Sequence, residues 1–307
     1  MLKTVIPTKQ IFGANVLRML LVSILLMNLL AINSGQAYQS NVNDSTNTKT
    51  KSDDNNKPLR IAVAANFTPV LKVLLKDFTR QTGIKTQVIS GASGAMFLQI
   101  KYGAPFDMFL SADSRRPKEL EQAGYALKDS RKTYAIGQLA LYSSSNNSNA
   151  NSLGQLSLEE ELAVDQLRKP PARFAIANPD TAPYGKAAKE ALTHLGLWQL
   201  YESRLIKGIN IGQTFAQLRS KAVTRGIVAN SQLVLNNLSG VIIPSNYHQA
   251  IEQQLIIIRS SKQQTAAEKL SHFLLSAQSQ NRIVSYGYAQ TQLVNNANKK
   301  LSELTAK

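Results

Sequence analysis

The feature that most constrains the fold is an alternation of short apolar runs with longer segments of helical periodicity, which begins at Leu59. The apolar run at 59–64 predicts a strand. After it, Thr68 and Pro69 predict the start of a helix, with Thr68 as its N-cap, and Gly83 predicts its end. This alternation is typical of βα units on a largely parallel sheet, so the sequence predicts an α/β fold.

The same alternation continues along most of the chain. Strands are expected at residues 85–89, 106–110, 134–142, 174–177, 226–229 and 254–258. Helices are expected from the turn at 91–94 to Tyr102, at 186–195 directly after a Pro-Tyr-Gly turn, and at 266–276. The strand at 254–258 would return the chain to the first lobe. The Ser- and Asn-rich stretch at 143–154, around Asn146, predicts a surface loop or the start of a second lobe.

The N-terminal residues predict export. Three basic residues precede an apolar run at 19–32, which is short for a membrane span of roughly 20 residues. Gly35 and Ala37 then provide the small residues that a signal peptidase recognises. Residues 1–37 are therefore expected to be a cleaved signal peptide, with an uncleaved membrane helix as the alternative, and the polar stretch 38–58 a disordered tether. The chain contains no cysteine that could carry a lipid anchor, so the expected location is a Gram-negative periplasm.

The formal net charge of +16 favours an anionic partner. The basic residues are scattered and lack interleaved aromatics, so no nucleic-acid partner is expected. His194, His248 and His272 are dispersed, which favours neither a catalytic nor a metal site. Asp107 and Asp113 lack a metal-ligand spacing and are expected to cap a helix or make contacts within the fold.

Three turns of neutral, donor-rich sequence each follow a predicted strand and precede a helix. They lie at 65–68, 91–94 and 182–185. Ligands of open α/β sheets bind beyond the carboxyl ends of the strands, where helix N-termini direct N–H groups outward. Such donors can hold a fully ionised tetrahedral anion without a charged side chain. The lack of an acceptor disfavours phosphate, which keeps a proton near neutral pH.

Each of these residues also has an ordinary structural interpretation. Ser93 alone would be an N-cap, and Asn66 could cap the first helix. Tyr184, between proline and glycine, could be a turn aromatic that covers the core. It is the joint placement of the three turns that favours a binding site.

Beyond these turns, the chain resembles the molybdate-binding periplasmic proteins of bacterial ABC importers, the ModA family. The similar segments follow one another in the family's order over nearly all of the globular region: 61–68, 91–94, 103–107, 109–113, 134–141, 177–179, 182–185, 226–232 and 286–288. The resemblance implies a two-lobed type II periplasmic binding protein with hinge crossover strands. Lobe 1 would comprise 59–137 plus 250–307, and lobe 2 would comprise 138–249.

The resemblance also implies a function and a ligand set. The protein would be the substrate-binding component of an ABC importer, capturing molybdate or tungstate as a monomer, without catalysis or a cofactor, and delivering it to an inner-membrane permease. The implied ligands are Ala65 through its backbone, Asn66, Ser93, Tyr184 and the backbone N–H of Ile211. Molybdenum would be bound as the oxyanion, without cation ligands. Because some members carry a ligand tyrosine where Ala229 stands, the outer donor is either Tyr184 or a residue near Ala229.

Three alternatives stay open. Within the same fold, the protein could bind or sense another oxyanion such as sulfate. An exported hydrolase would need a nucleophile, a base and an orienting group, and the sequence shows no such set. A nucleic-acid or surface binder rests on net charge alone.

Overall fold

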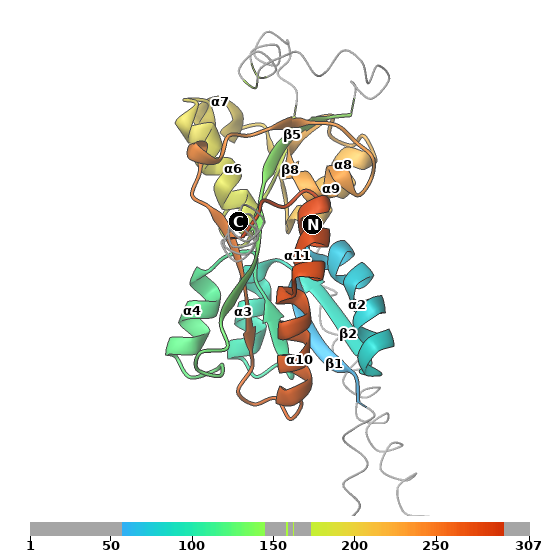
Figure 1. Cartoon of the computed structure of the whole chain (residues 1–307). Helices are drawn as coiled ribbons and strands as arrows, with labels where there is room; N and C mark the ends of the chain where they lie inside the picture. The colour runs from blue at the N-terminus through green and yellow to red at the C-terminus, as the bar shows by residue number, and fades with distance from the viewer. Residues whose placement is uncertain (1–56, 145–157, 159–161, 163–172, 292–307) are drawn as a thin grey trace, which may run out of the picture. The chain divides into compact units, whose positions relative to one another are not determined.

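The computed structural model of the chain describes residues 57–144, 158, 162 and 173–291 (Figure 1). The predicted signal peptide, the predicted tether up to residue 56 and the Ser/Asn insert near Asn146 lie outside these residues. Across the described ranges, no helix combines the length and the apolar character needed to cross a membrane.

Two mixed five-stranded sheets organise the described residues. The first has the order β2-β1-β3-β10-β4, with β1 parallel to β2 and β3 and β10 antiparallel to β3 and β4. The second has the order β7-β6-β8-β5-β9, with β6 parallel to β7 and β8 and β5 antiparallel to β8 and β9. The predicted α/β class with two lobes is confirmed, and the residue boundaries of the lobes stay a prediction.

The bounds of the elements are as follows. The first sheet contains β1 (Leu59–Ala64), β2 (Thr86–Gly91), β3 (Met108–Leu110), β4 (Lys132–Gly137) and β10 (Ile251–Ile257). The second contains β5 (Leu139–Ser143), β6 (Phe174–Ala177), β7 (Leu205–Gly208), β8 (Arg225–Ala229) and β9 (Val241–Ile242). The helices are α2 (Thr68–Thr82), α3 (Ser93–Lys101), α4 (Arg115–Gln122), α6 (Pro183–His194), α7 (Trp198–Glu202), α8 (Ile211–Arg219), α9 (Asn230–Val234), α10 (Gln264–Leu275) and α11 (Ala277–Ser285), with a 3-10 turn at Ser245–Tyr247.

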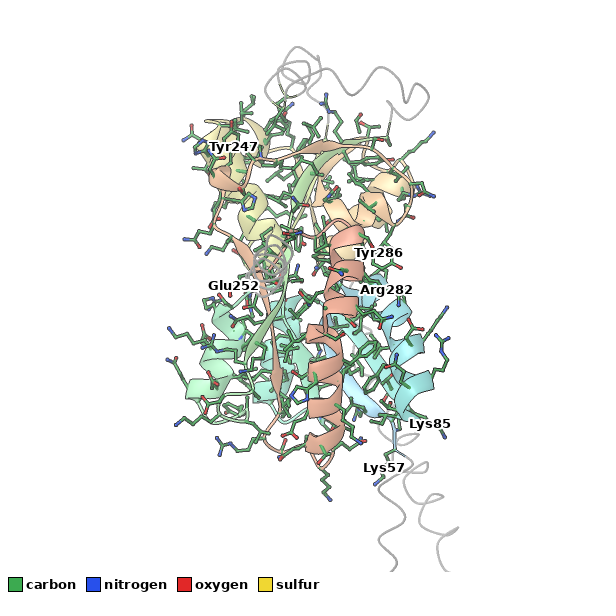
Figure 2. The ribbon with its side chains drawn as sticks, viewed as in Figure 1. Lys57, Lys85, Tyr247, Glu252, Arg282 and Tyr286 are labelled. Carbon is green, nitrogen blue, oxygen red and sulfur yellow. The ribbon has the colours of Figure 1, made fainter. Side chains whose placement is uncertain are left out.

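Helices cover both faces of the first sheet. Successive residues of a strand point to opposite faces, so Ile61 and Val63 pack against α2, α10 and α11, whereas Ala62 faces the core under α3 and α4 (Figure 1). An ion pair between Arg282 of α11, which is labelled in Figure 2, and Asp77 of α2 links two of these helices. Burial on both faces explains why β1 is apolar without interruption from Ile61 to Ala64.

The chain crosses between the sheets where the sequence predicts one strand at 134–142. That prediction is wrong, because β4 ends at Gly137 in the first sheet and β5 begins at Leu139 in the second. A side chain at residue 137 would clash with the Tyr184 hydroxyl, so glycine is required at this crossover. The predicted return of the chain to the first sheet is confirmed by β10, which begins at Ile251.

Two predicted helix starts are corrected. Phe67, and not Thr68, occupies the N-cap position of α2, and the Thr68 hydroxyl lies 2.7 Å from the Ser90 hydroxyl instead. The predicted Pro-Tyr-Gly turn is the first turn of α6. Proline is compatible with this position, because the first N–H groups of a helix have no partner within the helix. The predicted end of α2 at Gly83 is confirmed by its φ of 71° and by its N–H, which donates to the Thr79 carbonyl.

The two aspartates that flank β3 have structural partners. Asp107 accepts hydrogen bonds from the Arg60 N–H at 2.7 Å and from the Ser261 hydroxyl at 2.6 Å. Asp113 accepts from the Arg116 N–H at 3.2 Å in the first turn of α4 and forms an ion pair with the Arg116 side chain. These contacts confirm the predicted capping and internal contacts.

We expect Asp107→Asn to lower the free energy of unfolding by about 1–3 kcal/mol, because its amide cannot accept from all the donors that face a buried carboxylate. Urea unfolding measures the change. Asp180→Asn, at an exposed position, is the matched control and should leave the free energy of unfolding unchanged. Equal stability of the two variants would contradict this role of Asp107.

Candidate functional site

A small cavity lies where β1 ends and α3, α6 and α8 begin. The cavity volume is about 10 Å³, so the site is narrow. Its lining consists of Ala64, Ala65, Asn66, Gly91, Ala92, Ser93, Ala112, Ala182, Pro183, Tyr184, Asn210 and Ile211. All five predicted ligand residues are in this set, and none of the twelve carries a charged side chain.

Three helix N-termini supply backbone donors to this cavity. Ser93 is the first residue of α3, Tyr184 the second of α6 and Ile211 the first of α8. First-turn N–H groups have no partner inside their own helix, and they carry the positive end of the helix dipole. Within the described part of the chain, the N–H groups of Asn66, Ser93 and Ile211 have no protein acceptor.

The turn that presents Ile211 is held by a reciprocal pair of hydrogen bonds. Asn210 is the N-cap of α8, and its Oδ1 accepts from the Gln213 N–H at 3.0 Å. Gln213 Oε1 accepts in return from the Ile209 N–H at 2.6 Å. This arrangement resembles a capping box and fixes the direction of the Ile211 N–H. The sequence signal for this cap is Asn210 three residues before Gln213, and the sequence analysis missed it.

Ser93 is placed to donate a hydrogen bond to a ligand. Its side chain is 1% exposed, and its Oγ accepts from the Ala112 N–H at 2.9 Å. The hydroxyl hydrogen is therefore still available. The alternative interpretation of Ser93 as an ordinary N-cap is wrong, because Ala92 holds that position.

Asn66 faces the interior with its amide nitrogen. Nδ2 donates to Gln253 Oε1 at 2.9 Å and to the Tyr288 hydroxyl at 3.1 Å, and the Tyr288 hydroxyl donates to the Asn66 carbonyl at 3.1 Å. Oδ1 is buried without a hydrogen-bond partner among the described residues. Asn66 does not cap α2, since that helix has no side-chain cap.

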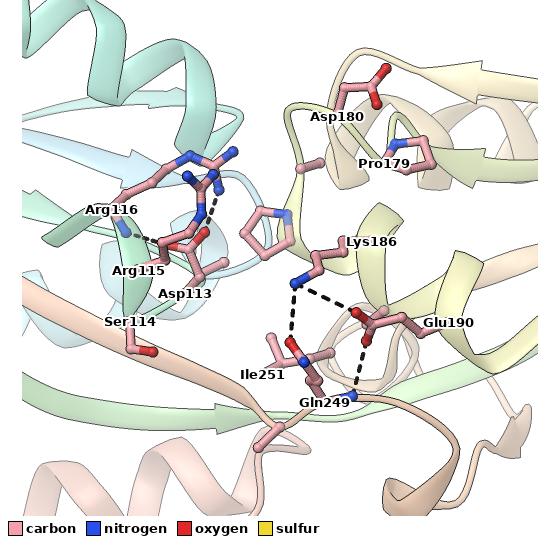
Figure 3. A pocket seen from close by; sticks show the side chains of 15 residues that line it. Asp113, Ser114, Arg115, Arg116, Pro179, Asp180, Lys186, Glu190, Gln249 and Ile251 are labelled. Atoms are coloured by element: carbon pink, nitrogen blue, oxygen red, sulfur yellow. Dashed lines mark hydrogen bonds and ion pairs between the residues drawn. The ribbon is translucent and has the colours of Figure 1, made fainter. Parts of the chain in front are cut away.

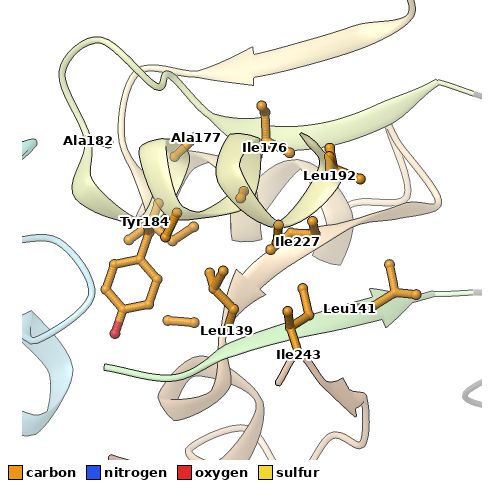
Figure 4. Packing of buried hydrophobic residues seen from close by; sticks show 14 of the residues in the cluster. Leu139, Leu141, Ile176, Ala177, Ala182, Tyr184, Leu192, Ile227 and Ile243 are labelled. Carbon is orange, nitrogen blue, oxygen red and sulfur yellow. The ribbon is translucent and has the colours of Figure 1, made fainter. Parts of the chain in front are cut away.

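Tyr184 reaches the cavity from the edge of an apolar cluster in the second sheet. Figure 4 shows its ring beside Leu139, with the hydroxyl pointing away from Leu192. The hydroxyl oxygen accepts from Gln253 Nε2 at 3.1 Å. Ala229, the other predicted position for an outer donor, is not part of the lining, and its N–H donates to Gln232 Oε1 at 3.1 Å.

Ala65 lines the cavity, but its backbone N–H already has an acceptor within the protein and cannot bind a ligand. That N–H donates to the Gly91 carbonyl at 2.9 Å. The neighbouring N–H of Asn66 is the donor that this turn offers. Sequence reasoning also missed Gln253, because it stands among three consecutive polar residues, 252–254, near the start of β10 and no local signal distinguishes it from its neighbours.

Burial keeps three tyrosines around the site neutral. Burial raises the pKa of the Tyr184 phenol well above its usual value, and the nearby Tyr288 raises it further. The pKa of Tyr134 is raised chiefly by burial and then by Tyr288, and burial also raises that of Tyr288. The Tyr184 phenol therefore remains a hydrogen-bond donor at physiological pH.

A second pocket adjoins the cavity and shares Ala112, Ala182 and Pro183 with it (Figure 3). Its lining carries three basic and three acidic side chains: Arg115, Arg116, Lys186, Asp113, Asp180 and Glu190. Arg116 is paired with Asp113, and Lys186 lies 3.5 Å from Glu190. The charges of this pocket balance, whereas the lining of the inner cavity has no charged side chain.

Known proteins similar to this chain are solute-binding proteins. The family model of bacterial extracellular solute-binding proteins matches residues 59–289. The molybdate-binding protein ModA of Azotobacter vinelandii is 35% identical over 235 residues, which are 75% of this chain and 89% of that protein. ModA of Rhodobacter capsulatus is 34% identical over 74% of this chain and 86% of its own length. The structure of the Azotobacter vinelandii periplasmic molybdate-binding protein matches with a TM-score of 0.68 and 32% identity, covering 76% of this chain and 99% of that one.

We expect the free energy of unfolding to fall as the pH rises above about 10, the usual pKa of tyrosine. Above that pH the unfolded chain loses phenolic protons that the folded protein still holds, so the unfolded state binds fewer protons and stability decreases. Each buried tyrosine contributes at most about 1.4 kcal/mol per pH unit. Urea unfolding over a pH series measures the slope.

Tyr134→Phe should make this slope shallower, because it removes one of the buried phenols. Tyr102→Phe is the control, since the Tyr102 side chain is 86% exposed. If both variants keep the slope of the parent protein, burial of the phenols is not its cause.

Proposed function

The chain belongs to the bacterial extracellular solute-binding proteins, and among these to the molybdate-binding ModA proteins, and we propose that it captures molybdate or tungstate as the substrate-binding component of an ABC importer. Its relatives are binding proteins, and we propose that this chain likewise binds and releases its ligand without a chemical step or a cofactor.

The observation that carries the proposal is a small cavity that offers neutral donors and has no charged side chain in its lining. Two hydroxyl groups, on Ser93 and Tyr184, and the backbone N–H groups of Asn66, Ser93 and Ile211 surround it. A tetrahedral dianion offers four oxygen acceptors to such donors. Three helix N-termini contribute partial positive charge, so a charged side chain is not needed to balance the anion.

The protonation state of the ligand distinguishes the candidate anions. Molybdate, tungstate and sulfate are fully ionised at neutral pH, whereas phosphate keeps a proton that needs an acceptor. Asn66 Oδ1 is a buried acceptor without a partner among the described residues, so phosphate would be held if this oxygen faced it. Titration with phosphate therefore tests the donor-only argument directly.

We propose that the protein acts in the periplasm, as its Azotobacter relative does by name. In this proposal residues 1–37 direct export, and the loaded monomer delivers its anion to an inner-membrane permease. The apolar run at 19–32 and the small residues after it support export.

Calorimetric titration of the purified protein with molybdate, tungstate, sulfate and phosphate tests the function. We expect saturable binding of molybdate and tungstate, and we expect Ser93→Ala to weaken it by about 10- to 100-fold, the usual cost of losing a hydrogen bond to a charged group.

Ser285→Ala is the matched control, because that hydroxyl bonds to the Arg282 carbonyl at the end of α11 and lies outside the cavity lining. Absence of saturable binding of either metal oxyanion would sink the proposal. Tight sulfate binding without molybdate or tungstate binding would move the substrate to another oxyanion.

A further inference from the structure

Gln253 is a fully buried polar residue of β10 that does not line the cavity but contacts two residues that do. Its carboxamide lies between Asn66, which follows β1, and Tyr184, which belongs to α6. Gln253 is part of the first sheet, whereas α6 packs against the second. The side chain therefore links the two sheets beside the site.

The two ends of this carboxamide have opposite hydrogen-bonding roles. Gln253 Oε1 accepts from Asn66 Nδ2 at 2.9 Å and lies 3.0 Å from the Tyr134 hydroxyl, which is also within reach of the Ser111 carbonyl. Nε2 donates to the Tyr184 hydroxyl oxygen at 3.1 Å. Because that oxygen accepts from Gln253, the single hydrogen of the Tyr184 hydroxyl is left for another acceptor.

The reverse orientation of the carboxamide would have the opposite effect. With Oε1 facing Tyr184, the phenol would donate to Gln253, and its hydrogen would be lost to a ligand. The oxygen of Asn66 would then have to face Gln253, so the two carboxamides turn together. The orientation of Gln253 thus decides whether the Tyr184 hydroxyl can donate into the cavity.

We propose that Gln253 is a positioning residue, which holds the Tyr184 hydroxyl as a hydrogen-bond donor to the bound oxyanion. This inference rests on the proposed function, since the direction of the hydroxyl matters only if the ligand is an acceptor. Gly137 supports the arrangement, because any side chain there would displace the same hydroxyl.

A double-mutant cycle between Gln253→Glu and Tyr184→Phe tests the proposal, with molybdate affinity measured by calorimetry. A carboxylate at 253 still accepts from Asn66 and Tyr134, but it takes the Tyr184 hydrogen instead of donating to the oxygen. We expect Tyr184→Phe to cost about tenfold in affinity in the parent protein and less than about twofold in the Gln253→Glu background.

Gln254→Glu is the matched control. This neighbouring glutamine is also buried, and its side chain contacts Thr133, Glu252 and Arg131, none of which lines the cavity. The added charge is therefore the same, but Tyr184→Phe should still cost about tenfold in that background.

Thermal unfolding without ligand checks that each variant folds. If Gln253→Glu does not fold, the cycle uses Gln253→Met, which lacks the donor to Tyr184 but offers no competing acceptor, so Tyr184→Phe should cost less than in the parent but more than in Gln253→Glu. An equal cost of Tyr184→Phe in the parent and in the Gln253 variant would overturn the role of Gln253. Failure of the parent protein to bind molybdate or tungstate would instead remove the proposed function, and the inference with it.

Discussion

The arrangement of the site depends on one constraint, which is that donors without acceptors are costly to bury. Helices α3, α6 and α8 begin at the same small cavity, and Ser93 and Tyr184 each keep a hydroxyl hydrogen that no described residue accepts. Each unsatisfied buried donor costs about 1–3 kcal/mol, which a ligand rich in oxygen acceptors removes. Satisfying these donors therefore contributes to the binding free energy. Because the unsatisfied groups are donors, the site favours a ligand whose atoms are acceptors.

Much of the fold is predictable because its strands are buried on both faces. The strands at residues 59–64 and 174–177 were predicted at the bounds that the structure has, since each is a short and largely apolar run. The crossover at Gln138 was not predicted, although Gly137 and Gln138 interrupt the apolar segment from 134 to 142 at this point. The reason for glycine at 137 comes from a distant residue, because a side chain there would clash with the Tyr184 hydroxyl. The highly polar helix α4 was missed because few of its residues face the core.

The site shows the same division between local and long-range information. Ser93, Asn66 and Tyr184 could be found because each stands in a turn after a strand, and the family resemblance then selected them. Gln253 could not be found in this way, because its role comes from partners 69 to 187 positions away in the chain. The unused N–H of Asn66, beside the occupied N–H of Ala65, likewise depends on which carbonyl of β2 lies opposite.

The distribution of charge explains how a basic protein can have a neutral site. The net charge of +16 belongs to dispersed side chains, which act at long range and are screened by salt. They can raise the local concentration of every anion, but they cannot distinguish one from another. Discrimination requires short-range groups with a fixed direction, and these are the hydroxyls and helix N-termini of the cavity. A charged residue there would strengthen attraction for all anions alike, whereas oriented neutral donors reward only a ligand whose oxygens are all acceptors. Gln253 matters for this reason, because it controls the direction of a donor and adds no charge.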